Sequence, residues 1–225
     1  MHNCIISFGR IRKADVTERA TGSGLTSGGI GRRGDELADA KAPVRGEGNA
    51  AGFVSIMGAA AATAAQMEAF VLGINPAPKL PYCTVRELAE MFLEEGRAEG
   101  VRGDVAWAQA IQETGYFRYG RIVTPDMNNY SGIGALYEDR PGFGARFDTP
   151  RLGVRAQVQH LKAYATTEPL AGQCVDPRFD LVPRGSAPYA QWLGAADNPT
   201  GRGWAFPGDG YGAHIVAILG RMLEG

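Results

Sequence analysis

The stretch "WAQAIQETGYFRYG", residues 107–120, decides how this sequence is interpreted. Its first half is apolar nearly all round, so it predicts the end of a buried helix whose expected N-cap is Asp104. One carboxylate, Glu113, stands at the end of this helix, just before Gly115, and three aromatic residues follow: Tyr116, Phe117 and Tyr119. Because a helix C-terminus and apolar neighbours both disfavour a negative charge, we expect the pKa of this carboxyl to be raised.

Glu113 has two interpretations. It is either an exposed and inert acid at a helix end, or the general acid of a glycosidase. A carboxyl that stays protonated near neutral pH can give its proton to the leaving oxygen of a glycosidic bond. The neighbouring aromatic rings would also suit the apolar faces of sugars. The residues by themselves leave both interpretations open.

Four further segments predict helices. Thr63 is the expected N-cap of the first, and Thr84 with Glu87 forms a capping box for the second. The others are residues 151–165 and 211–223, which carry apolar residues at helical spacing. Residues 125–147 contain several Gly and Asn with alternating aromatics and predict a loop with a short β-hairpin. The fold class is therefore mostly α, with one small β element. The acids of the second helix are interpreted as a solvated face: Glu90, Glu94, Glu95 and Glu99.

The N-terminal part has a different composition. Residues 1–54 are rich in Gly and Ser and almost free of aromatic residues. Such a segment buries little apolar surface, so we expect a flexible arm, or a segment that becomes ordered against a partner. Residues 55–225 form the predicted domain. No secretory signal is visible at the N-terminus.

Composition excludes several classes of protein. The formal net charge is -1, which argues against a nucleic-acid partner. No apolar run is long enough for a membrane span. The three His are scattered, and no zinc or phosphate-binding motif occurs, so no metal site is expected. Of the three cysteines, Cys83 and Cys174 are a candidate disulfide pair, while Cys4 stays free.

Three segments together resemble a known family. "AWAQAIQETGYFRYG", "NNYSGIGA" and "GVRAQVQHLKAYA" are similar to the glucosaminidase domain of glycoside hydrolase family 73, over roughly residues 55–225. These are bacterial and phage peptidoglycan hydrolases. The resemblance implies a lysozyme-like fold with a small β-hairpin beside the cleft.

The resemblance also implies roles for single residues. The family's catalytic acid falls on Glu113, and Tyr211 falls on an aromatic residue that faces the cleft. Further substrate-binding residues are implied along the cleft: Asn128, Asn129, Ser131, Gly132, Trp204 and Tyr116. His160 and Tyr164 also match, but their helical spacing favours a structural role.

The second carboxylate is less well defined. Some family members use a Glu of the β-hairpin to activate water, and here Glu138 is the first candidate, before Asp139 and Asp148. An inverting enzyme needs the two carboxyl groups about 6.5–9.5 Å apart. Without such a pair, the 2-acetamido oxygen of the substrate could attack instead.

The expected function is that of an endo-β-N-acetylglucosaminidase, which cleaves the bond between N-acetylglucosamine and N-acetylmuramic acid in peptidoglycan. The alternatives are a lytic transglycosylase with the same fold and a non-catalytic wall-binding module. We expect no cofactor, peptidoglycan glycan strands as the partner, and a monomer. The substrate implies a place of action outside the cytoplasm, at the cell wall.

Overall fold

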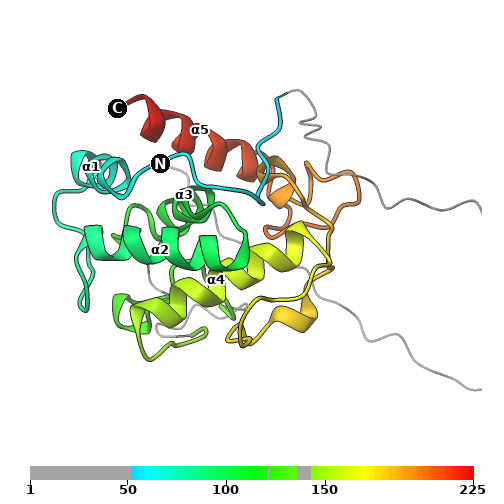
Figure 1. The fold of residues 1–225 in the computed structure, drawn as a ribbon, viewed down its shortest axis with the longest axis horizontal. Helices are drawn as coiled ribbons and strands as arrows, with labels where there is room; N and C mark the ends of the chain where they lie inside the picture. Colours follow the sequence, from blue (N-terminus) through cyan, green and yellow to red (C-terminus); the bar gives the residue numbers. More distant parts are fainter. Residues whose placement is uncertain (1–51, 121, 136–142) are drawn as a thin grey trace, which may run out of the picture. The chain divides into compact units, whose positions relative to one another are not determined.

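A computed structural model describes residues 52–120, 122–135 and 143–225 of the chain (Figure 1). In this part the chain forms five α-helices and three short 3-10 helices, and isolated β-bridges take the place of strands. The α-helices are α1 (Ala64–Ile74), α2 (Val85–Glu99), α3 (Gly103–Thr114), α4 (Pro150–Ala165) and α5 (Tyr211–Glu224), and the 3-10 helices are η1 (Pro125–Met127), η2 (Phe179–Leu181) and η3 (Ala190–Leu193). The prediction of a mostly α fold is confirmed.

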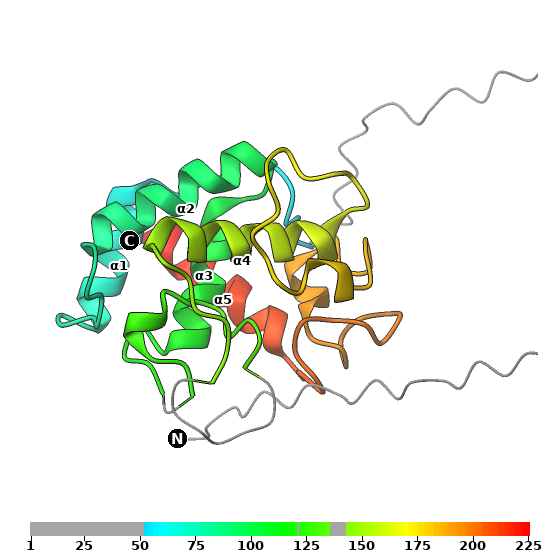
Figure 2. The ribbon, with the colours of Figure 1, turned by 90° about the horizontal axis from the view of Figure 1, so that it is seen from below.

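Helix α3 lies at the centre of this arrangement. It contacts α1, α2, α4 and α5, and nearly all of its side chains are buried. Trp107 on α3 packs edge-on against Phe92 of α2, with ring centroids 5.4 Å apart, and in a tilted arrangement against Phe117, with centroids 5.1 Å apart. Figures 1 and 2 show α2 and α4 side by side, and the C-terminal end of α5 beside α1. The apolar character of α3 on all sides follows from this surrounded position.

The N-termini of the helices show which sequence signals act locally and which depend on tertiary contacts. Thr84 forms the predicted capping box with Glu87, and Thr63 is the N-cap of α1 as predicted. Thr63 also forms a capping box with Gln66, which was not predicted. The predicted N-cap Asp104 is wrong, because Arg102 takes that position and Asp104 lies inside the first turn of α3. The buried Asp104 carboxylate instead accepts hydrogen bonds from the backbone N–H groups of Ala61 and Ala62 and from Arg102. It therefore ties the segment before α1 to α3.

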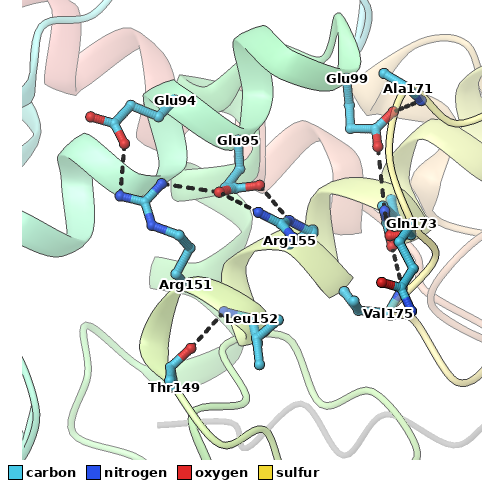
Figure 3. Close-up of polar contacts among 11 residues, drawn as sticks. Glu94, Glu95, Glu99, Thr149, Arg151, Leu152, Arg155, Ala171, Gln173 and Val175 are labelled. Carbon is cyan, nitrogen blue, oxygen red and sulfur yellow. Dashed lines mark hydrogen bonds and ion pairs between the residues drawn. The ribbon is translucent and has the colours of Figure 1, made fainter.

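The prediction that the acids of α2 form a solvated face is wrong for two of them. Glu95 and Glu99 are both buried, with only 5% of their surface exposed, and do not belong to a solvated face. Glu95 accepts hydrogen bonds from Arg151 and Arg155 of α4 (Figure 3). Glu99 accepts one from Lys162 of the same helix. Cations on the facing helix replace the water that these carboxylates lose. We call these five residues the α2–α4 seam.

The predicted β-hairpin has no strand among its described residues. Residues 136–142, which include Glu138 and Asp139, lie outside the described part. On either side, the amide of Asn129 bonds the backbone directly: its Nδ2 donates to Ile133 O and Ala145 O, and its Oδ1 accepts from the N–H of Ile133. Two backbone hydrogen bonds, from the N–H of Ala145 to Ile133 O and from the N–H of Phe147 to Met127 O, also join the two sides of the loop, but no strand forms among the described residues.

The predicted domain boundary after residue 54 moves toward the N-terminus. Phe53 packs on Tyr189 and Trp192, with ring centroids 5.4 and 5.9 Å apart. The carbonyl of Val54 accepts a hydrogen bond from the N–H of Ala190. Residues 53 and 54 thus belong to the domain, while the expected flexibility of residues 1–51 falls outside the described part.

The predicted disulfide is not formed, since Cys83 and Cys174 are both free thiols. Cys83 directly precedes the N-cap of α2. Cys174 follows Gln173, which bonds Gln159 beside Glu99 at the other end of α2. A helix of 15 residues spans about 22 Å, which is far beyond the Cα separation of roughly 7 Å that a disulfide tolerates.

Candidate active site

Glu113 is the penultimate residue of α3, and Gly115 ends the helix in the left-handed conformation with φ 58°. Its side chain is partly exposed at the surface but surrounded by protein on its other sides. Burial raises the pKa of Glu113 to about 8, although a hydrogen bond from Tyr211 acts in the opposite direction. The carboxyl is therefore mostly protonated at neutral pH. The expectation of a raised pKa agrees with this environment.

Tyr211 is the partner of Glu113. Its hydroxyl donates a hydrogen bond to Oε1 of Glu113, across 98 residues of sequence. Burial raises the pKa of Tyr211 well above its ordinary value, and the neighbouring Glu113 raises it further, so the phenol keeps its proton and acts as a donor. Tyr211 is the first residue of α5, and Gln112 also bonds its carbonyl oxygen. The start of α5 is thus attached to the end of α3 at two points.

The three aromatic residues that follow Glu113 form the turn at the end of α3, and their backbone conformation is unusual. Tyr116, Phe117 and Tyr119 all have φ between 57° and 59°, which is unfavourable for residues with a side chain. Thr114 holds this turn, because its Oγ1 accepts from the N–H of Phe117 and donates to Ala110 O. Strained residues of this kind persist only where the surroundings fix them, and they concentrate at functional sites.

Two aromatic side chains of this turn pack against other parts of the protein. Phe117 is fully buried against Trp107. Tyr116, an expected substrate-binding residue, packs 6.1 Å from Phe70, and its hydroxyl accepts a hydrogen bond from Arg221 of α5. The structure therefore places Tyr116 between α1 and α5.

The loop of the "NNYSGIG" motif comes close to Glu113 at Gly132. A methyl group added at Gly132 would lie 3.9 Å from Oε2 of Glu113. Asn128 and Asn129 are buried, and their side chains bond backbone groups of the same loop region. Ser131 is also buried, and its Oγ has no hydrogen-bond partner in the described part of the chain. The Asn residues build the loop, and Gly132 brings it beside the acid.

Trp204 lies in the core rather than on an open surface. Only 2% of it is exposed, and its ring packs edge-on against His160 with centroids 4.5 Å apart. His160 Nδ1 lies 2.6 Å from Oδ2 of Asp176, and Tyr164 OH donates to Gly203 O. His160 and Tyr164 thus have the structural role favoured by their spacing. Trp204 presents no face for stacking on a sugar in this arrangement.

The position of a second carboxylate stays a prediction. Glu138 and Asp139 lie outside the described residues, and Asp148 is exposed just before the N-cap of α4. Within residues 52–120, 122–135 and 143–225, no further carboxylate forms a hydrogen bond with Glu113 or Tyr211. The same part of the chain has no group of acids, His and Cys that could hold a metal ion.

Gln109 is a residue of this site that the sequence interpretation missed. It lies four residues before Glu113 on the same face of α3, and its Nε2 donates to the hydroxyl of Tyr211 at 3.1 Å. Gln109 is fully buried. A polar side chain on an otherwise apolar, central helix is the sequence signal that would have indicated it.

The comparisons with known proteins leave the family unassigned. No protein-family model matches the chain, and no solved structure matches it. A protein of Borreliella burgdorferi is 40% identical over 119 residues, which is 53% of this chain, and its name is "Uncharacterized protein". The match spans 56% of that relative, so the chain corresponds to about half of its length. In the described residues, no helix has both the length and the apolar character for crossing a bilayer.

Proposed function

We propose that this protein is a peptidoglycan hydrolase, an endo-β-N-acetylglucosaminidase that uses Glu113 as its general acid. One observation carries the proposal. Glu113 is held protonated near neutral pH at the end of a buried helix, with Tyr211 bonded to one of its oxygens and the other beside Gly132. General acids of glycosidases need this combination of a raised pKa and an accessible proton.

In the proposed reaction, Oε2 of Glu113 gives its proton to the glycosidic oxygen between N-acetylglucosamine and N-acetylmuramic acid. The bond from the anomeric carbon to that oxygen breaks, and its electron pair stays with the oxygen. Positive charge develops on the sugar, and water completes the hydrolysis. Tyr211 stabilises the carboxylate that forms, because its hydrogen bond to Oε1 becomes charge-assisted.

The group that activates water is open in this proposal. It is either an acid such as Glu138 or the 2-acetamido oxygen of the substrate. The resemblance of "AWAQAIQETGYFRYG" and "NNYSGIGA" to family 73 glucosaminidases supports the choice of substrate. Glycan strands of the cell wall would be the partner, and the place of action would lie outside the cytoplasm.

A lytic transglycosylase is the second candidate, and one observation favours it. Glu113 has no carboxylate neighbour bonded to its site among the described residues. A transglycosylase needs only one acid, because a hydroxyl of the substrate attacks in place of water and closes an anhydro ring. Both candidates use Glu113 and Tyr211 in the same way.

Mass spectrometry of peptidoglycan digested by the protein tests the proposal. We expect fragments with N-acetylglucosamine at the new reducing end, and no fragments with the Glu113→Gln variant. Products lighter by one water would identify a lytic transglycosylase. Undigested walls that nevertheless bind the protein would contradict both enzymes and indicate a wall-binding module.

A further inference from the structure

We infer that Gln109 and Gln157 are positioning residues: acting through Tyr211, they determine which oxygen of Glu113 accepts a hydrogen bond and which one carries the acid proton. This inference rests on the proposed function of Glu113. It adds a second buried amide, Gln157, and a proton direction to the site. Both amides are fully buried, Gln109 on α3 and Gln157 on α4.

A backbone carbonyl fixes the direction of these hydrogen bonds. Nε2 of Gln157 lies 2.9 Å from Ala106 O, which can only accept a hydrogen bond. The same Nε2 lies 2.9 Å from Gln109, and since an amide NH₂ only donates, the Gln109 atom facing it must be the oxygen. A flipped Gln157 would set its own oxygen against two other oxygens. Gln109 therefore turns its Nε2 toward Tyr211, at 3.1 Å.

The direction continues to the acid. Because the hydroxyl of Tyr211 receives a hydrogen from Gln109, its own proton points to Oε1 of Glu113. Oε1 then serves as the carbonyl oxygen of the protonated acid, since a neutral carboxyl has one O–H donor. The proton is left on Oε2, the oxygen beside Gly132. The buried amides thus keep the reactive proton on the Glu113 oxygen that faces the loop of Gly132.

Gln159 provides a matched control for Gln157, because both lie on α4. Gln159 of α4 is also fully buried, but its Nε2 donates to Glu99, at the C-terminal end of α2, and to Gln173 O. Gln159→Met therefore removes a buried amide without touching the hydrogen bonds of Tyr211. Gln109→Met and Gln157→Met remove the two amides of the inference while keeping a side chain of similar length.

The test is a titration of the Glu113 carboxyl by carbon NMR on the full chain, with Glu113→Gln used to assign its signal. The wild-type midpoint is expected at about pH 8. Tyr211→Phe removes the hydrogen bond that favours the carboxylate, so its midpoint should rise by about one pH unit. Gln109→Met and Gln157→Met should raise it by smaller amounts in that order, and Gln159→Met should leave it unchanged.

A double variant shows whether the effect passes through Tyr211. In the Tyr211→Phe background, Gln109→Met should add no further shift, because the hydroxyl that transmits its effect is absent. An independent second shift would overturn the inference. So would unchanged midpoints in the single variants, or an equal shift in Gln159→Met. If Gln109→Met fails to fold, Gln157→Met carries the test, since it touches neither Tyr211 nor Glu113.

Wall digestion by the same variants separates this inference from the proposed function. A wild type that leaves walls intact would contradict the proposed function, while the titrations would still decide the proton direction. An active wild type whose Glu113 titrates identically in all Gln variants would overturn only the present inference.

Discussion

At the scale of single residues, protonation is the property of Glu113 that matters. Its raised pKa follows mainly from burial, and a nearby carboxylate is not needed to explain it. The phenol of Tyr211 moderates the rise without removing it. Burial therefore keeps the acid protonated before the reaction, and the hydrogen bond from Tyr211 stabilises the carboxylate afterwards.

Glu113→Gln should abolish wall hydrolysis, with a loss of at least about 10²–10⁴-fold, because the amide has no proton to give. Wall binding should persist, since the shape of the side chain is nearly unchanged. Turbidity of a wall suspension and a sedimentation assay measure the two properties. A variant with full activity would show that Glu113 is an inert helix-end acid.

The same substitution should change how stability depends on pH. The pKa of Glu113 is about 8 in the folded protein and near 4.5 when unfolded, so only the unfolded chain releases the proton between these values. The contribution of Glu113 to stability is therefore complete below pH 4.5 and is lost as pH rises through 8. Urea unfolding should show Glu113→Gln gaining stability over the wild type as pH rises through this window. A constant difference would contradict the raised pKa.

The activity of the wild type should decline on the alkaline side near pH 8, where Glu113 loses its proton. The measurement is the initial rate of wall hydrolysis against pH, at constant ionic strength. A decline that is already complete near pH 4.5, the ordinary value for Glu, would mean that the working acid is another residue.

At the scale of helices, the α2–α4 seam fixes how two helices lie against each other. Burial by itself raises the pKa of Glu95, but hydrogen bonds from Arg155 and Arg151 outweigh it and leave the pKa below its usual value. Glu94 bonds Arg151 as well, but half of its side chain is exposed. The two neighbouring acids therefore differ in burial while sharing a partner (Figure 3).

Glu95→Gln should destabilise the protein by about 1.5–3 kcal/mol at neutral pH, since it removes charge-assisted hydrogen bonds from a buried position. Glu94→Gln is the control and should cost less than about 1 kcal/mol, as exposed ion pairs do. Because the pKa of Glu95 is lowered, its contribution is present above the usual Glu value and is lost as pH falls through the folded value. Urea unfolding should thus show the two variants converging in acid; equal effects at neutral pH would contradict the role of burial.

At the scale of the whole molecule, the docking of α5 decides whether Tyr211 meets Glu113. Gly212 lets α5 approach η3 closely, because a Cβ at this position would lie 2.1 Å from Ala190 O. Gly220, further along the same helix, has nothing within 4 Å of such a Cβ. Packing therefore requires glycine at position 212, whereas position 220 has room for a larger side chain.

Gly212→Ala should therefore destabilise the protein and lower wall hydrolysis, because α5 must shift and take Tyr211 with it. Gly220→Ala should be neutral or stabilise by up to about 1 kcal/mol through helix propensity, with activity unchanged. Thermal unfolding and initial rates measure both variants. If Gly212→Ala kept full stability and activity, close docking of α5 would not be what positions Tyr211.

The sequence by itself determined the features that depend on near neighbours along the chain. The N-cap at Thr63, the capping box at Thr84, the central apolar helix and the place of Glu113 at its end follow from residues within one or two turns of each other. These signals are local, because a helix forms its hydrogen bonds between residues four apart. They gave the mostly α class and the expectation of a raised pKa.

Only the tertiary structure decided what each polar side chain meets. Glu95 and Glu99 have the pattern of solvated acids, but α4 covers them with Arg and Lys. Tyr211 reaches Glu113 across 98 residues, and Gln157 reaches Gln109 across 48. Such pairs exist because helices distant in sequence pack together and exclude water, which leaves buried polar groups to satisfy one another. The charge state of Glu113 and the direction of its proton belong to this packing.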